Sequence, residues 1–173
     1  GVFALAYSLY GGLRAVALTD IIQVTLLVAG GLMISWILLD QIGDGRGPIA
    51  GFVALSDQAP EKFEMILAQD HAHYMSLPGL SVLLGGMWIM NLSYWGFNQY
   101  IIQRALAAKS IDEAQKGIVF AAFLKLLMPL IVVLPGIAMY ALSPDLSAPD
   151  KAYPSAMMLL PTGVKGLVFA ALL

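Results

Sequence analysis

The sequence predicts an all-α, polytopic membrane protein, and three features of composition and pattern support this fold class. Hydrophobic residues make up 60% of the 173 residues, and the mean hydropathy is +0.82. Only 12% of the residues are charged, whereas soluble domains carry about 25%, so the chain lacks the charge that a water-facing surface needs. The third feature is a set of three apolar stretches of about 20 residues or more, which is the length of a membrane-spanning helix.

The predicted transmembrane helices comprise residues 15–39, 80–103 and 117–142. The apolar residues 1–10 are expected to end one further helix, and residues 163–173 are expected to begin another. Gly11 and Gly12 are expected to form the turn between the first two apolar stretches. Because no initial Met precedes residue 1 and both outer stretches are too short to cross a bilayer, we expect this chain to be a fragment that requires the rest of its polypeptide.

The connecting segments suggest an orientation in the membrane. Residues 41–79 form a long polar loop, residues 104–116 a compact turn, and residues 143–162 a Pro-rich loop. Four basic residues are expected on each side of the membrane. One side holds Arg14, Arg104, Lys109 and Lys116, and the other holds Arg46, Lys62, Lys151 and Lys165. The first set lies in shorter loops close to helix ends. The positive-inside rule therefore places residues 104–116 in the cytoplasm and the other two loops outside.

The long loop contains an amphipathic stretch at residues 60–69. Its apolar residues Phe63, Ile66 and Leu67 follow helical spacing. We expect a short helix lying on the membrane surface there.

Two charged residues, Asp20 and Lys125, interrupt the predicted spans. A charge near the centre of a spanning helix costs about 2.5–3.5 kcal/mol on insertion scales, and such residues commonly mark functional sites. Two structural explanations remain open. Asp20 could form a buried ion pair or hydrogen bond with another helix, and the long Lys125 side chain could reach back toward the membrane surface.

The span of residues 80–103 is unusually polar and rich in glycine. Its polar side chains are those of Asn91, Ser93, Asn98, Gln99 and Gln103, and its glycines are Gly85, Gly86 and Gly96. Hydrogen bonding between helices would explain some of these residues. Five polar side chains in one span instead favour a broken helix that lines a water-filled cavity.

The predicted depths bring four side chains to a similar level. Asn91 lies about 18 Å and Lys125 about 12 Å from the predicted cytoplasmic turn, and the length of the lysine side chain covers the difference. Tyr94 follows Asn91 by three residues and is expected on the same helical face, with Trp95 beside it. An amide, a phenol, an indole and an ammonium group together suit a ligand rich in hydroxyl groups, because they offer donors, acceptors and an aromatic surface for a sugar ring.

Other kinds of site are disfavoured. The chain has no cysteine, which excludes disulfides and thiolate metal sites, and its formal net charge of −2 gives no basic footprint for nucleic acid. No Ser, His and Asp arrangement points to catalysis, so we do not expect an enzyme. His71 and His73 lack further ligands nearby, and we expect no metal site and no cofactor in this chain.

Three blocks of the sequence resemble the solute:sodium symporter family. They read YSLYGGLRAVALTDIIQV, NLSYWGFNQYIIQRALAAKSIDEAQKGIVFAAFLK and PTGVKGLVFAALL, and the resemblance is strongest to bacterial members that carry galactose or glucose. It covers nearly the whole chain. It implies a multi-pass protein of the cell (inner) membrane with a LeuT-type core of two inverted repeats, in which residues 15–39 end the first repeat.

The resemblance also implies roles for individual residues. Asn91 and Lys125 match sugar-binding residues, Tyr94 matches an inner gate beneath the sugar with Trp95 beside it, and Asp20 matches an acidic residue on the sodium exit path. The implied coupling ion is Na⁺, and the main sodium site is expected outside this chain. The implied activity is sodium-coupled sugar symport by alternating access.

Departures from the family pattern keep other readings open. Ser93 replaces an aromatic residue of the galactose carriers, and the loop at residues 143–154 looks shorter than theirs. The same scaffold could carry an inositol, sialic acid, proline or a carboxylate. A transporter-like sensor module and a membrane scaffold without transport are the remaining alternatives.

Overall fold

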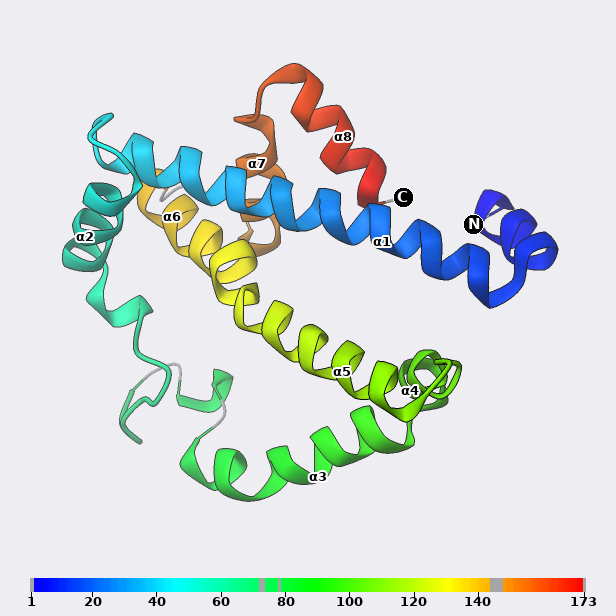
Figure 1. Ribbon diagram of the computed structural model, residues 1–173. Coiled ribbons are helices and arrows are strands. Elements are labelled where there is room, and N and C mark those ends of the chain that lie inside the picture. The colour runs from blue at the N-terminus through cyan, green and yellow to red at the C-terminus, as the bar shows by residue number, and fades with distance from the viewer. Residues whose placement is uncertain (1, 72–73, 78, 144–147, 173) are drawn as a thin grey trace. The chain divides into compact units, whose positions relative to one another are not determined.

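The computed structural model describes residues 2–71, 74–77, 79–143 and 148–172, and all regular structure in these residues is helical (Figure 1). This agrees with the predicted all-α class. The chain divides into two units. The first comprises Gly1–Gln58 and Met128–Leu173, and the second comprises Ala59–Leu127.

The first unit is built on the long helix α1 (Val2–Ile42). Gly12 interrupts it with φ 57° and ψ −156°, a backbone conformation that residues with a Cβ rarely adopt. The non-helical residue therefore lies in the glycine pair where the sequence predicts a turn. The stretch Leu9–Ile42, which contains this interruption, is one of two helices in the described chain that are long and apolar enough to cross a membrane. The other is Ile111–Leu142.

A tight turn joins α1 to α2 (Pro48–Gln58). The Asp40 carboxylate accepts a hydrogen bond of 3.0 Å from the Gly47 amide and closes this turn. The two helices then approach so closely that a Cβ built on Gly51 would lie 1.7 Å from the carbonyl oxygen of Leu39. A glycine at this position is what allows the helical hairpin to form.

The amphipathic helix predicted at residues 60–69 is wrong for most of its length. Only Pro60–Lys62 is helical, as a short 3₁₀ turn, and the residues that follow are irregular. Phe63 and Ile66 remain 36% and 53% exposed, so folding within the chain buries the predicted apolar face only in part. Within residues 41–79, the helix that forms is instead α2, and it buries Leu55 completely. This apolar burial offsets the conformational entropy that is lost when the segment becomes ordered.

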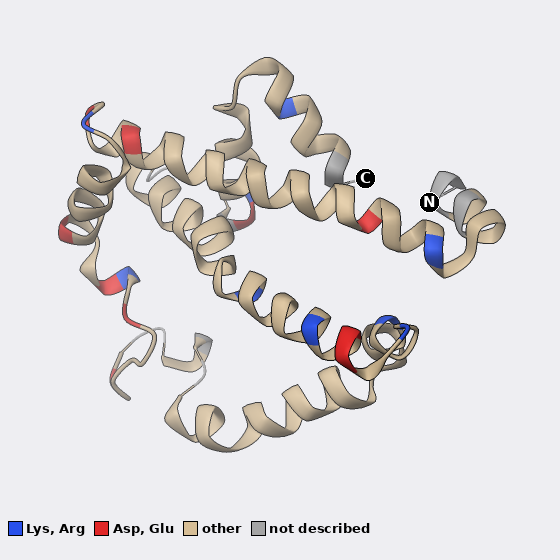
Figure 2. Ribbon diagram, in the orientation of Figure 1, with Lys and Arg blue, Asp and Glu red and all other residues tan. Residues whose placement is uncertain are grey.

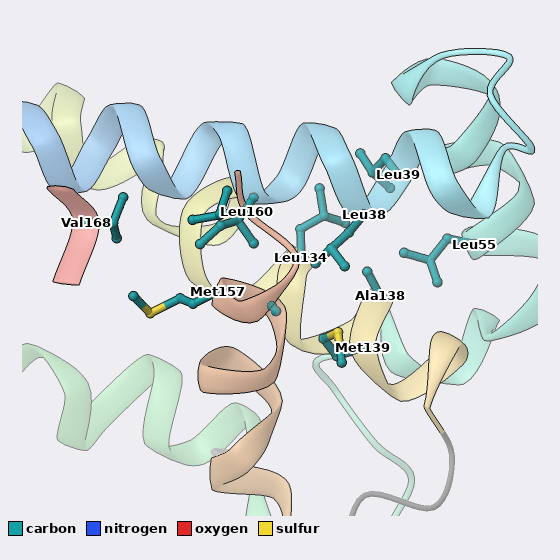
Figure 3. Close-up of a cluster of buried hydrophobic side chains, with 11 residues drawn as sticks. Leu38, Leu39, Leu55, Leu134, Ala138, Met139, Met157, Leu160 and Val168 are labelled. Atoms are coloured by element: carbon teal, nitrogen blue, oxygen red, sulfur yellow. The ribbon is translucent and has the colours of Figure 1, made fainter. Parts of the chain in front are cut away.

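The apolar core of the first unit lies where α1 meets α6 (Leu134–Leu142), α7 (Ala152–Met158) and α8 (Thr162–Leu172). Leu38, Leu134 and Leu160 gather beneath α1 in Figure 3, with Leu55 of α2 beside them. The helix α8 packs at Gly30, where an added Cβ would lie 2.3 Å from Val168 Cγ2. Small residues on α1 thus admit the neighbouring helices at close range.

The second unit holds a segment of alternating helix types and a hairpin. Wide π-helical turns, Val82–Gly86 and Ser93–Phe97, flank α3 (Met87–Leu92). The helices α4 (Gln99–Leu106) and α5 (Ile111–Leu126) follow.

The turn between α4 and α5 ends at the N-terminus of α5. Ser110 Oγ accepts a hydrogen bond of 3.2 Å from the Glu113 amide and caps α5, as the spacing of these two residues predicts. Figure 2 shows blue ribbon segments, which mark Lys and Arg, at and beside this turn. The members of this basic group are Arg104, Lys109 and Lys116.

Candidate functional site

The segment that carries most of the predicted site residues is not a regular α-helix. Gly85 and Gly86 lie in the first π-helical turn, and Gly96 lies in the second. At Asn98 the backbone becomes extended, with φ −81° and ψ 108°, and helix α4 begins at the next residue. Helical hydrogen bonding is therefore widened twice and then interrupted. Such irregularity within a helix is frequent at functional sites.

The Asn98 side chain stabilises the restart of the helix. Its Oδ1 accepts a hydrogen bond of 3.1 Å from the Tyr100 amide, which is the geometry of an N-cap. The sequence marks this asparagine only as one of several polar residues in the span. Its capping role is recognised from the backbone break that precedes α4.

We expect Asn98→Ala to destabilise the start of α4 by about 1 kcal/mol, because the substitution removes the cap. Thermal unfolding of the purified full-length protein measures this effect. Asn98→Asp retains a capping oxygen and serves as the control. Equal melting temperatures for the alanine and aspartate variants would argue against a capping role.

Tyr94 and Trp95 form an aromatic pair in the turn Ser93–Phe97. Their ring centroids lie 5.3 Å apart with an interplanar angle of 82°, an edge-to-face arrangement that aromatic rings favour. The side chains are 49% and 41% exposed. Both rings therefore retain surface that a ligand can contact.

Lys125 comes from the last turn of α5 and lies over the same indole. Its Nζ is 4.7 Å from the centroid of the Trp95 ring, within the range of a cation–π interaction. Residues that are distant in the sequence thus form one cluster, in which Trp95 contacts both Tyr94 and Lys125. The ammonium and the phenol can donate hydrogen bonds, and the indole supplies a flat apolar surface.

Asn91 lies on the same segment, four residues before Trp95. Its Nδ2 donates a hydrogen bond of 2.8 Å to the Met87 carbonyl of its own helix. In the described part of the chain, no hydrogen bond joins Asn91 to Lys125. That these two side chains share a ligand therefore stays a prediction.

Asp20 belongs to the other unit, within the membrane-length helix Leu9–Ile42, and is partly exposed. Of the two histidines considered as metal ligands, His71 is exposed, and His73 lies outside the described residues.

Comparisons with known proteins show the family to which the chain belongs. The model of the sodium:solute symporter family matches residues 1–173. The chain is 55% identical to the sodium/glucose cotransporter of Vibrio parahaemolyticus over 188 aligned positions, which cover 99% of this chain and 35% of that protein.

Two other relatives are more distant. The uncharacterized symporter YidK of Escherichia coli strain K12 is 38% identical over 99% of this chain and 29% of its own length. The human sodium/myo-inositol cotransporter 2 is 33% identical over 96% of this chain and 28% of its own length. The chain thus spans about a third of the length of the relatives it matches. Because the family model matches from the first residue to the last, this polytopic, all-α membrane chain belongs to the sodium:solute symporter family.

Proposed function

We propose that this chain is part of a sodium-coupled symporter that carries a sugar, galactose or glucose, across the cell (inner) membrane by alternating access. The observation that carries the proposal is the cluster of Lys125, Trp95 and Tyr94, which comes from α5 and an irregular helical segment. Transporters of this architecture bind substrate at broken helices near the bilayer midplane. The Vibrio relative is a sodium/glucose cotransporter, which supports the same substrate class.

Each residue of the site has a proposed role. Asn91 and Lys125 hydrogen-bond sugar hydroxyls, and Tyr94 stacks beneath the ring as the inner gate, with Trp95 beside it. Asp20 lies on the path by which sodium leaves toward the cytoplasm. The main sodium site is formed by other parts of the polypeptide, so neither transport nor complete binding is expected from this chain alone.

The chemistry of the cluster fits binding and not covalent catalysis. A lysine held over an indole is a hydrogen-bond donor for hydroxyl groups, and an exposed aromatic ring packs against the C–H face of a sugar. We therefore propose that the protein is a carrier and not an enzyme. Its partners are sodium ions, a sugar, lipids and the rest of its own polypeptide, and nucleic acid is not among them.

Uptake by the full-length protein in proteoliposomes tests the proposal. We expect an inward sodium gradient to drive accumulation of labelled galactose or glucose, because coupling makes sugar movement depend on the sodium gradient. A potassium gradient of the same size is the control. Accumulation that is equal under both gradients would contradict sodium coupling.

An inositol is the second candidate substrate, because the human relative is a sodium/myo-inositol cotransporter and the Lys125 ammonium suits any polyol. Competition in the same vesicles separates the candidates. Unlabelled galactose or glucose should block uptake of the labelled sugar more strongly than myo-inositol, sialic acid, proline or a carboxylate. Stronger competition by one of these would reassign the substrate within the same scaffold.

A further inference from the structure

A buried serine on α1 contacts the carbonyl group of a π-helical turn in the first unit. This turn, Pro129–Val133, precedes α6. Ser35 is only 6% exposed, and its hydroxyl donates a hydrogen bond to the Leu130 carbonyl. Among the described residues, Ser35 is a buried polar residue, whereas the buried residues around it are apolar.

The Leu130 carbonyl accepts this bond because its two helical donors are missing. In a regular α-helix the amide of Leu134 would donate to it, but that amide bonds to the Pro129 carbonyl instead. In π-helical spacing the donor would be residue 135. That residue is Pro135, which has no amide hydrogen. A partly buried carbonyl without a hydrogen-bond donor is unfavourable, and the Ser35 hydroxyl supplies the missing donor.

The close approach of the two helices makes this bond possible. Gly31 lies one helical turn before Ser35 on the same face of α1. A Cβ at Gly31 would lie 2.3 Å from Ile131 Cγ2. The glycine thus lets the turn Pro129–Val133 reach α1 at the level where Ser35 can donate to it.

The Ser35 hydroxyl has a second acceptor within its own helix. The Gly31 carbonyl lies 3.1 Å from Ser35 Oγ, and a hydroxyl carries a single hydrogen. If the bond to Leu130 breaks, the hydrogen can turn to Gly31, as serines in helices commonly do. Ser35 therefore stays hydrogen-bonded with or without the contact between the two helices, which makes the contact reversible.

We propose that Ser35 is a latch between helices that replaces the missing amide of Pro135 and holds the turn Pro129–Val133 against α1. We further propose that release of this latch is a step in the conformational cycle, a part that rests on the proposed transport function. A π-helical turn next to a proline is a place where a helix can bend. The hydrogen bond from Ser35 would determine whether the bend at this turn is fixed against α1.

A double-mutant comparison in the full-length protein tests the latch itself, with the melting temperature as the readout. Ser35→Ala should lower it by a few degrees. In a Pro135→Ala background the same substitution should lower it less, because an amide at position 135 can serve the Leu130 carbonyl or let the turn return to α-helical spacing. Ser56→Ala is the matched control, since the Ser56 hydroxyl donates to the Val53 carbonyl of its own helix. An equal drop in both backgrounds, or no drop, would overturn the latch.

Sodium-dependent uptake tests the conformational part. Loss of one hydrogen bond of ordinary net strength should change the maximal uptake rate by about fivefold, while the KM for sugar stays unchanged because none of the proposed sugar-binding side chains is altered. A lower melting temperature with an unchanged maximal rate would reduce Ser35 to a packing role. If the wild-type protein shows no sodium-dependent uptake, the proposed function fails, whereas the melting comparison still decides the latch.

Discussion

Replacing Lys125 with alanine in the full-length protein is expected to remove most sodium-dependent sugar uptake while leaving membrane insertion intact. The ammonium lies 4.7 Å from the Trp95 ring centroid, where it can donate to a sugar that packs against the aromatic pair. A hydrogen bond from a charged group contributes about 1.5–3 kcal/mol, which corresponds to a loss of about ten- to a hundredfold in uptake below the KM. Uptake at several sugar concentrations and protein level in the membrane are the measurements.

Two variants make this result interpretable. Lys116→Ala is the matched control, because Lys116 belongs to the same helix and its Nζ lies 2.6 Å from the exposed carboxylate of Asp112. It should leave uptake unchanged, since exposed ion pairs contribute little. Lys125→Arg retains a cation that stacks on an indole and should keep part of the activity. Normal uptake by Lys125→Ala would remove the proposed role of Lys125 in sugar binding.

Replacing Gly51 with alanine is expected to have the largest effect on stability. The new Cβ would lie 1.7 Å from the carbonyl oxygen of Leu39 and 2.5 Å from its carbon. Both are backbone atoms of α1, which cannot rotate away as a side chain can. α2 must therefore move outward and uncover Leu55, at a cost of about 1–3 kcal/mol or more.

Thermal unfolding and expression level of the full-length protein measure this effect. Gly136→Ala provides the control within the same unit. Apart from the chain neighbours and the nearby backbone of its own helix α6, no atom of the described chain lies within 4 Å of a Cβ at Gly136. Alanine there should therefore leave stability unchanged or raise it slightly. An unchanged melting temperature for Gly51→Ala would show that α1 and α2 do not pack this closely in the full-length protein.

The helices and their irregularities differ in how far the sequence predicts them. Apolar runs predict the long helices because a run of this length needs internal backbone hydrogen bonding in lipid. Glycines lie in two of the π-helical turns, Val82–Gly86 and Ser93–Phe97, and the Gly12 interruption falls within the predicted glycine pair. The third π-helical turn, Pro129–Val133, contains no glycine. The amphipathic pattern at residues 60–69 misled, because spacing alone does not show whether the chain will bury that face. The missed helix α2 forms through its contact with α1.

The sequence by itself determined the all-α class, the membrane as solvent, and the residue types of the candidate site, because composition and local pattern carry this information. Only the tertiary structure shows that Lys125 lies over the Trp95 ring and that Gly51 lets α2 pack against the backbone of α1. It also shows that the Ser35 hydroxyl donates a hydrogen bond to the Leu130 carbonyl. Each of these contacts joins residues of different helical segments. Such pairs depend on how the helices bend and pack, and the spacing of residues within one helix does not contain that information.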